Sequence, residues 1–187
     1  MRIVGIVGSP RVGGNTETLT RIALEEISNE GLETELIRLA GKRIEPCDAC
    51  GTCRTSKKCH RKDDFESVYA KMSESCGIIL STPVYYGAAS PQMAALISRC
   101  YAYPRDDRPF ENKVGGPIVV ARRAGHNFTF AQLMFFFMYH GMIVPGSTYW
   151  NIAFGREIGT VTKDAEGILT VRNFGRKLAW LAKKVTA

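Results

Sequence analysis

Residues 8–16 read Gly-Ser-Pro-Arg-Val-Gly-Gly-Asn-Thr, and this stretch decides the fold that we expect for the chain. The run Arg2–Val7 before it is apolar and β-branched, which predicts a buried strand. Apolar residues recur at helical spacing over 16–29 after it, which predicts an amphipathic helix. A glycine-rich turn between a strand and a helix favours anion binding, because free backbone N–H groups and the positive end of the helix dipole meet there.

The residue types in this turn favour a phosphate as the anion. Ser9, Asn15 and Thr16 offer side-chain donors, and Arg11 adds a full positive charge. Gly14 and two other glycines let the backbone bend tightly and approach a ligand. The pattern is neither Walker A nor GxGxxG, so we expect a phosphate site of another kind. The alternative is an ordinary strand-to-helix turn in which Asn15 caps the helix.

Composition and charge narrow the class of protein. The chain has 187 residues, 45% hydrophobic and 23% charged, without a repeat or linker, so we expect one domain over 1–187. The net charge is +7, but Lys and Arg are scattered, which argues against a nucleic-acid partner. No apolar run reaches the ~18 residues of a membrane span, and the first residues lack a secretory-signal pattern. We therefore expect a cytoplasmic protein without a membrane partner.

Strand and helix patterns alternate along the rest of the chain. Further strands are predicted at 33–39, 77–81, 113–121 and, as a short fifth strand, within 142–150. Further helices are predicted at 63–74 with Asp63 as N-cap, and at 91–101, 128–140 and 164–184. This alternation predicts an α/β fold with an open parallel sheet in strand order 2-1-3-4-5. Ligands of such sheets bind at the carboxyl ends of the strands, where the turns at 9–16, 83–90 and 122–127 would meet.

The two later turns carry groups that suit a flat aromatic ring. Tyr85 and Tyr86 can stack on such a ring or line its edge, and Gly87 allows close backbone approach. Arg122 brings positive charge to the same edge of the sheet, and His126 can donate a hydrogen bond. Simpler explanations stay open: the tyrosines can cover core residues, and a lone histidine beside a helix start often has no special role.

Four of the six cysteines crowd into a loop over residues 45–62, with the spacing Cys47-x2-Cys50-x2-Cys53-x5-Cys59. In a cytosolic protein such a group indicates metal or redox chemistry rather than structural disulfides. This spacing can ligate a [4Fe–4S] cluster, and the basic residues around it suit an anionic cluster. Zinc is the main alternative, although its structural sites usually separate two cysteine pairs by a longer stretch. A third interpretation is that the loop binds no metal, and that its thiols are unligated or include a redox pair such as Cys50 and Cys53.

In combination, these motifs resemble the flavodoxin-like NAD(P)H-dependent FMN reductase superfamily, and most of all its iron–sulfur flavoprotein branch. The matching segments are Gly8-Ser9-Pro10-Arg11 with Gly14-Asn15-Thr16, the four cysteines followed by Asp63-Asp64, and Ser81-Thr82-Pro83-Val84-Tyr85-Tyr86. The resemblance implies a flavodoxin-like three-layer αβα sandwich with a five-stranded sheet. It implies that the first turn binds the phosphate of FMN, the second its isoalloxazine and ribityl chain, and that the third flanks the polar end of the ring. The residues in these roles would be Ser9, Arg11, Gly14, Asn15, Thr16, Pro83, Val84, Tyr85, Tyr86, Gly87, Ala121, Arg122, Gly125 and His126.

For the cysteine loop, the resemblance implies a [4Fe–4S] cluster on Cys47, Cys50, Cys53 and Cys59 that exchanges electrons with FMN. The implied activity is that of an oxidoreductase that takes electrons from NAD(P)H or a ferredoxin and passes them to an acceptor. Members of this branch are dimers or tetramers with the cluster near the FMN of a neighbouring subunit, so we expect a homodimer or homotetramer. The competing expectation is an FMN electron shuttle without a small-molecule substrate, whose cysteine loop holds zinc or no cluster.

Overall fold

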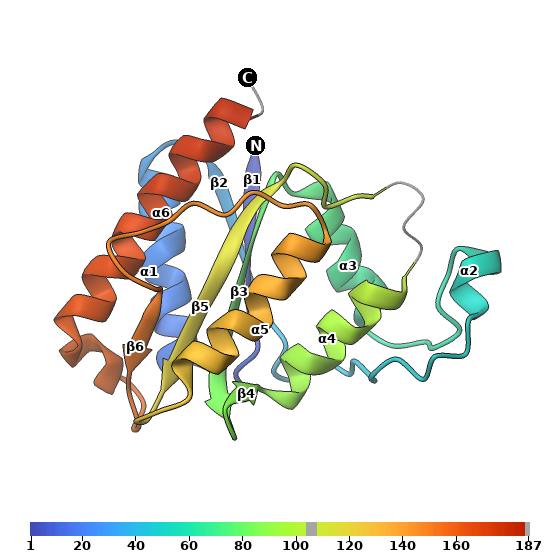
Figure 1. Cartoon of the computed structure of the whole chain (residues 1–187), viewed down its shortest axis with the longest axis horizontal. Helices are drawn as coiled ribbons and strands as arrows, with labels where there is room; N and C mark the ends of the chain where they lie inside the picture. The colour runs from blue at the N-terminus through green and yellow to red at the C-terminus, as the bar shows by residue number, and fades with distance from the viewer. Residues whose placement is uncertain (104–107, 186–187) are drawn as a thin grey trace.

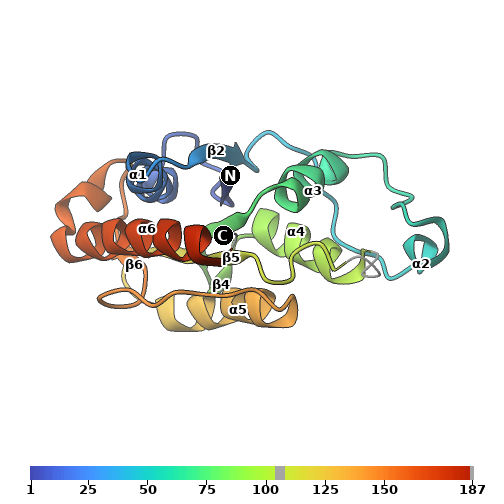
Figure 2. The ribbon, with the colours of Figure 1, turned by 90° about the horizontal axis from the view of Figure 1, so that it is seen from above.

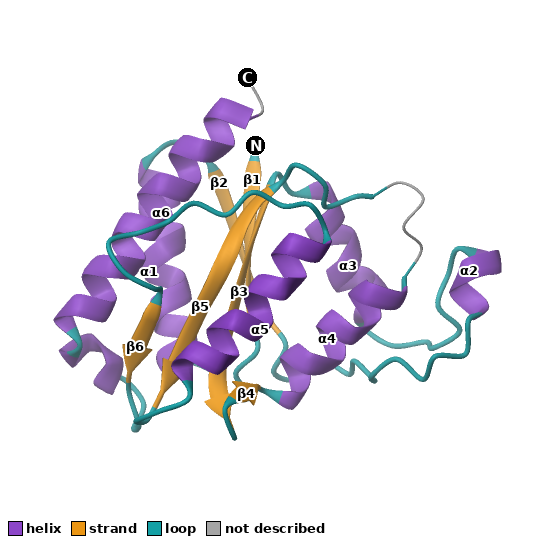
Figure 3. Cartoon of the chain, in the orientation of Figure 1, coloured by secondary structure: helices purple, strands orange, loops and turns teal. Residues whose placement is uncertain are grey.

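The computed structural model describes residues 1–103 and 108–185, in which strands and helices alternate (Figure 3). The elements in chain order are β1 (Arg2–Val7), α1 (Asn15–Asn29), β2 (Glu33–Arg38), α2 (Thr52–Ser56), α3 (Phe65–Glu74), β3 (Gly77–Tyr85), β4 (Ala88–Ala89), α4 (Pro91–Ala102), β5 (Val114–Ala121), α5 (His126–Tyr139), β6 (Ile152–Phe154), the 3₁₀-helix η1 (Thr160–Lys163) and α6 (Ala165–Val185).

The central sheet is parallel and runs in the order β2-β1-β3-β5-β6 (Figure 1). The short strand β4 stands apart from this order, because it pairs antiparallel with the end of β3. Counting only the parallel strands, this is the predicted order 2-1-3-4-5, which is confirmed. The strand order reverses between β1 and β3, and that switch point is where ligands bind in such sheets.

Helices cover both faces of the sheet, so the core lies in two layers (Figure 2). On one face, α1 and α6 pack Leu19, Ile27, Phe174 and Leu178 against sheet residues that include Ile79. On the other face, α3, α4 and α5 contribute a second group: Phe65, Met72, Met93, Leu96, Leu133 and Phe137. Burial on both faces explains why the central strands are nearly unbroken apolar runs. No helix in the described part of the chain combines the length and the apolar character that a membrane span requires.

Several predicted elements differ from the observed ones. The fifth strand is β6, and residues 142–150 form only an isolated parallel bridge between Ile143 and Val114. Pro145 and Gly146 interrupt that stretch, and proline has no N–H for a strand ladder, so regular pairing begins after them. The N-cap of α3 is Asp64, not Asp63. The sequence also showed no signal for β4 or for α2, a single helical turn inside the cysteine loop.

Candidate functional site

The glycine-rich turn joins β1 to α1 at the carboxyl end of the sheet. Gly14 is the N-cap residue of α1, and the helix begins without a hydrogen bond from a capping side chain. The alternative in which Asn15 caps the helix is therefore wrong. The first N–H groups of a helix have no partner within it, and without a side-chain cap these groups can bind an anion.

Glu17 supports this turn from within the protein. Its buried carboxylate accepts hydrogen bonds from the Gly13 N–H at 2.9 Å and from Arg38 Nε and Nη2 at 2.8 and 2.7 Å. Arg21 Nε donates to it at 3.0 Å. The hydrogen bonds from Arg38 are the main cause that lowers the Glu17 pKa to about 2, although burial opposes them. Two arginines thus balance the carboxylate charge, and the backbone of the turn is held in place.

The Asn15 side chain forms hydrogen bonds to the neighbouring 157–161 segment. Its Nδ2 donates to Glu157 O at 2.8 Å, and its Oδ1 accepts from the Val161 N–H at 3.3 Å. A Cβ on Gly155 would lie 2.6 Å from this Nδ2, so only glycine allows the close approach. The loop after β6 therefore packs directly on the first turn, and the backbone N–H of Asn15 is the group left for a ligand.

The second turn is a hairpin between β3 and β4, with Tyr86 and Gly87 at its tip. Both residues have positive φ, 52° and 77°, as the type I′ turn of a two-residue hairpin requires. The Tyr86 side chain is fully exposed, which removes the explanation that it covers core residues. Ser90 Oγ donates to Gly8 O at 2.6 Å and so ties this hairpin to the first turn.

The third turn packs against the second through Gly125, whose φ is 93°. A Cβ there would lie 2.8 Å from Val84 Cγ1 and 3.1 Å from Gly87 Cα. The next residue, His126, points elsewhere: its Nε2 lies 3.1 Å from Ala153 O, and its buried ring meets the Phe154 ring edge-on. Burial lowers the pKa of His126, so the neutral ring is favoured.

The three turns enclose a pocket of about 270 Å³. Most residues predicted to hold the cofactor line it, namely Ser9, Arg11, Asn15, Thr16, Pro83, Val84, Tyr85, Ala121 and Arg122. The remaining predicted residues do not line it, namely Gly14, Tyr86, Gly87, Gly125 and His126. Three further lining residues, Val120, Gly155 and Arg156, are not predicted from the sequence. The last two follow β6, a strand that the sequence predicts within 142–150 instead. Three arginines and no acidic side chain stand among the described lining residues, which suits a phosphate.

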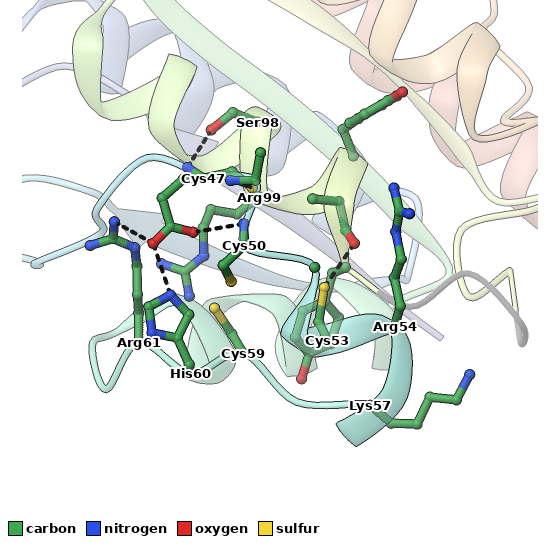
Figure 4. A pocket seen from close by; sticks show the side chains of 16 residues that line it. Cys47, Cys50, Cys53, Arg54, Lys57, Cys59, His60, Arg61, Ser98 and Arg99 are labelled. Atoms are coloured by element: carbon green, nitrogen blue, oxygen red, sulfur yellow. Dashed lines mark hydrogen bonds and ion pairs between the residues drawn. The ribbon is translucent and has the colours of Figure 1, made fainter.

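The four clustered cysteines line a second cavity, of about 620 Å³, between the α2 loop and the end of α4 (Figure 4). Figure 1 shows α2 at the far right, away from the sheet. All four thiols are free and at least partly exposed. Cys53 Sγ donates to Ala102 O at 3.1 Å, and burial is the main cause that raises the Cys53 pKa. The loop thus brings all four predicted ligands to one cavity.

The distances between the four thiols help to distinguish a single zinc ion from an iron–sulfur cluster. In the described part of the chain, no three of these four sulfur atoms lie within 4.8 Å of one another. A tetrahedral zinc ion needs a tighter set, because bonds of ~2.3 Å put its sulfurs roughly 3.8 Å apart. A [4Fe–4S] cubane binds each thiolate through a different iron and accepts a wider spacing. The four thiols as they stand do not form a zinc-sized set, whereas their number and their shared cavity suit the four ligands of a [4Fe–4S] cluster.

A smaller group of potential metal ligands does have its ligand atoms close enough together to bind one metal ion. Ligand atoms of Asp48, Cys50 and His60 lie within 4.8 Å of one another on the exposed side of the loop. Asp48 Oδ2 lies 2.9 Å from His60 Nε2 and accepts from Arg61 Nη2 at 3.0 Å. A hydrogen bond from the Cys50 side chain is the main cause that lowers the Asp48 pKa to about 2. This mixed oxygen, sulfur and nitrogen set is of the kind that zinc accepts.

A doubly wound parallel sheet that gathers a phosphate-type turn and two further turns at its β1/β3 switch point defines a flavodoxin-like protein. Comparison with known families makes this class more specific, since the family of NADPH-dependent FMN reductases matches residues 1–157. The chain belongs to this family, within its iron–sulfur flavoprotein branch. The resemblance inferred from the sequence motifs is thereby confirmed.

Individual relatives cover nearly the whole chain. An iron–sulfur flavoprotein of Methanocaldococcus jannaschii is 40% identical over 99% of both chains. An iron–sulfur flavoprotein of Methanosarcina thermophila is 36% identical over 95% of this chain and 93% of its own. The solved structure of a flavodoxin, WrbA-like protein from Agrobacterium tumefaciens is 18% identical and covers 98% of this chain and 97% of that chain, with a TM-score of 0.69. This last likeness shows the shared fold alone.

Proposed function

We propose that this protein is an FMN-dependent oxidoreductase that passes electrons between a reduced donor and an acceptor by way of FMN and a [4Fe–4S] cluster. One observation carries the proposal: a chain of the FMN reductase family holds an arginine-lined pocket at its switch point and, separately, a cavity lined by four cysteines. The first suits a phosphorylated cofactor, and the second suits a cluster. The whole chain would act as one domain.

The pocket at the switch point would hold FMN. Ser9, Arg11, Thr16 and the first N–H groups of α1 would bind its phosphate, and the segment 83–87 would lie along its ring. Bound FMN supplies reversible electron transfer, which the chain itself does not provide. Arg122 would place positive charge beside the ring and so favour its anionic reduced form. The Asn15 side chain would act indirectly, by holding the 157–161 segment against the turn.

The cysteine cavity would hold the cluster on Cys47, Cys50, Cys53 and Cys59. Four thiols on the wall of one cavity support a cluster, and so does the positive charge of Arg54, Lys57 and Arg61 on the same wall. The electron donor would be NAD(P)H or a ferredoxin. The protein would be a homodimer or homotetramer, as its resemblance to the iron–sulfur flavoprotein branch implies.

Anaerobic purification tests the two cofactors together. The absorbance spectrum should show flavin and iron–sulfur bands, and metal analysis should find about four irons per chain. Cys53→Ala should abolish the iron and leave FMN bound, whereas Cys76→Ala, which removes a thiol outside the loop, should change neither. Protein that stays colourless after reconstitution with FMN would refute the oxidoreductase proposal. Stoichiometric zinc in place of iron would refute the cluster.

A second candidate function is an FMN electron shuttle whose cysteine loop holds zinc. The compact group of Asp48, Cys50 and His60 favours the zinc part of this candidate. The net charge of +7 counts against a direct analogy to flavodoxins, which are typically acidic. Flavin reduction by NADH, NADPH or reduced ferredoxin separates the candidates, since fast turnover with a nicotinamide supports the reductase and reduction by ferredoxin alone supports the shuttle.

A further inference from the structure

Arg99, on α4, lines the cysteine cavity and is only 2% exposed. Burying a guanidinium is costly unless its charge and its N–H groups find partners. Nη1 donates to Asp63 Oδ2 at 2.7 Å and to Glu45 O at 3.1 Å. The guanidinium also lies over the Phe65 ring, with Cζ 4.2 Å from the ring centroid. These contacts satisfy one side of the group.

The other side of the guanidinium lacks a hydrogen-bond acceptor among the described residues. Nε and Nη2 of Arg99 are buried and make no hydrogen bond to the part of the protein that the structure describes. Buried cationic donors without acceptors are rare in folded proteins, so each one calls for an explanation. Cys59, one of the four proposed cluster ligands, lines the same cavity as Arg99. Figure 4 shows Arg99 among the four cysteines.

Asp63 fixes the orientation of the Arg99 guanidinium. Asp63 carries the opposing charge, and its own carboxylate accepts from the Glu45 N–H at 2.9 Å and from the Phe65 N–H at 3.2 Å. Both side chains of the Arg99–Asp63 pair are 2% exposed. The carboxylate, itself held by the backbone, therefore fixes Nη1, and Nε and Nη2 are left without an acceptor among the described residues, next to the cysteine cavity that Arg99 lines.

We propose that Arg99 is a positioning residue of the cysteine site, whose Nε and Nη2 groups donate hydrogen bonds to the Cys59 thiolate and to sulfur of the cluster that the cysteines bind. This inference rests on the proposed function, because it needs an anionic cluster in the cavity. Hydrogen bonds to cluster sulfurs stabilise the more negative, reduced state and so raise the reduction potential. Arg99 would therefore set the potential at which electrons enter or leave the cluster.

The test is the cluster's midpoint potential, measured by an anaerobic redox titration of the holoprotein followed by electron paramagnetic resonance. Arg99→Lys keeps the charge near Asp63 but loses the forked donors. We expect the potential to shift to more negative values in this variant, while the FMN potential stays the same. Arg43→Lys is the matched control, because Arg43 is an exposed arginine of the same loop region that does not line the cavity. Its cluster potential should equal that of the wild type.

If Arg99→Lys does not fold, the double variant Arg99→Met/Asp63→Asn removes both buried charges together and leaves no unpaired ion. We expect it to show the same negative shift and a faster loss of iron to a chelator. Wild-type and folded variant proteins with the same cluster potential would overturn the role of Arg99 and leave the cluster proposal intact. A wild type without iron would overturn the cluster proposal, and the role of Arg99 with it.

Discussion

At the scale of the residue, Glu17 makes the first turn sensitive to acid. Its carboxyl has a pKa of about 2 in the folded protein against 4.5 ordinarily, so its ion pairs stabilise the fold above pH ~4.5 and lose that effect as the pH falls toward 2. We expect Glu17→Gln to lower the free energy of unfolding at pH 7 by up to about 3 kcal/mol and to weaken its decline in acid. Urea unfolding between pH 3 and pH 7 measures both. Glu25→Gln, on the exposed side of the same helix, should change neither, and equal effects of the two variants would contradict the prediction.

The backbone of Tyr86 is strained, and its exposed side chain makes no contact with the described residues that would compensate for this strain. A left-handed φ of 52° costs a side chain such as tyrosine roughly 1–2 kcal/mol, yet the ring is fully exposed. We expect Tyr86→Asn to stabilise the fold by about 1 kcal/mol, since Asn-Gly is the preferred type I′ pair. Tyr86 does not line the pocket, so stacking on the flavin is a prediction from the sequence; if it holds, its loss should raise the Kd for FMN several-fold, a cost of about 1 kcal/mol. Thermal unfolding and flavin-fluorescence titration measure these changes. Tyr86→Phe should keep wild-type affinity, and an unchanged Kd in Tyr86→Asn would place the ring outside the flavin site.

At the scale of the element, Gly125 holds the start of α5 against the β3–β4 hairpin. An alanine there meets Val84 Cγ1 at 2.8 Å and must adopt a φ of 93°. We expect Gly125→Ala to destabilise the fold by roughly 2 kcal/mol and to weaken FMN binding, because the second and third turns separate. Gly146→Ala is the matched control, since a Cβ there meets nothing within 4 Å. If both variants have wild-type stability and FMN affinity, contact between these turns is not needed for the pocket.

Some elements of the fold could be predicted from the sequence, and others could not. The strand Arg2–Val7 and the helix after it could be predicted because their local patterns are long and unambiguous, and the strand order follows from general rules of α/β topology. The strand β6 could not be predicted, because three residues carry no periodic signal and the more strand-like stretch before Pro145 competes with it. The pairing of Arg99 with Asp63 is likewise invisible, since it depends on how α4 lies against a loop far away in sequence.

At the scale of the whole molecule, the two proposed cofactor sites lie apart. The cysteine cavity is next to α2, which projects away from the sheet in both Figure 1 and Figure 2, whereas the pocket is at the carboxyl ends of the strands. In the homodimer or homotetramer proposed above, electrons would pass from the cluster of one subunit to the FMN of another. The outer face of α5 offers a surface for a second copy, because Phe128, Phe135 and Met138 are exposed there.

Disrupting that surface tests whether the subunits must meet. We expect Phe135→Glu to shift the protein to smaller assemblies, measured by light scattering after size exclusion, because a buried carboxylate is costly. Iron and FMN content should stay at wild-type levels, since neither cavity includes Phe135. The rate at which a chemically reduced cluster passes its electron to FMN, followed by stopped-flow absorbance, should fall sharply. Trp180→Glu, on the exposed side of α6, is the control that should keep both assembly and rate. A monomeric Phe135→Glu protein with the wild-type rate would show instead that each chain transfers electrons within itself.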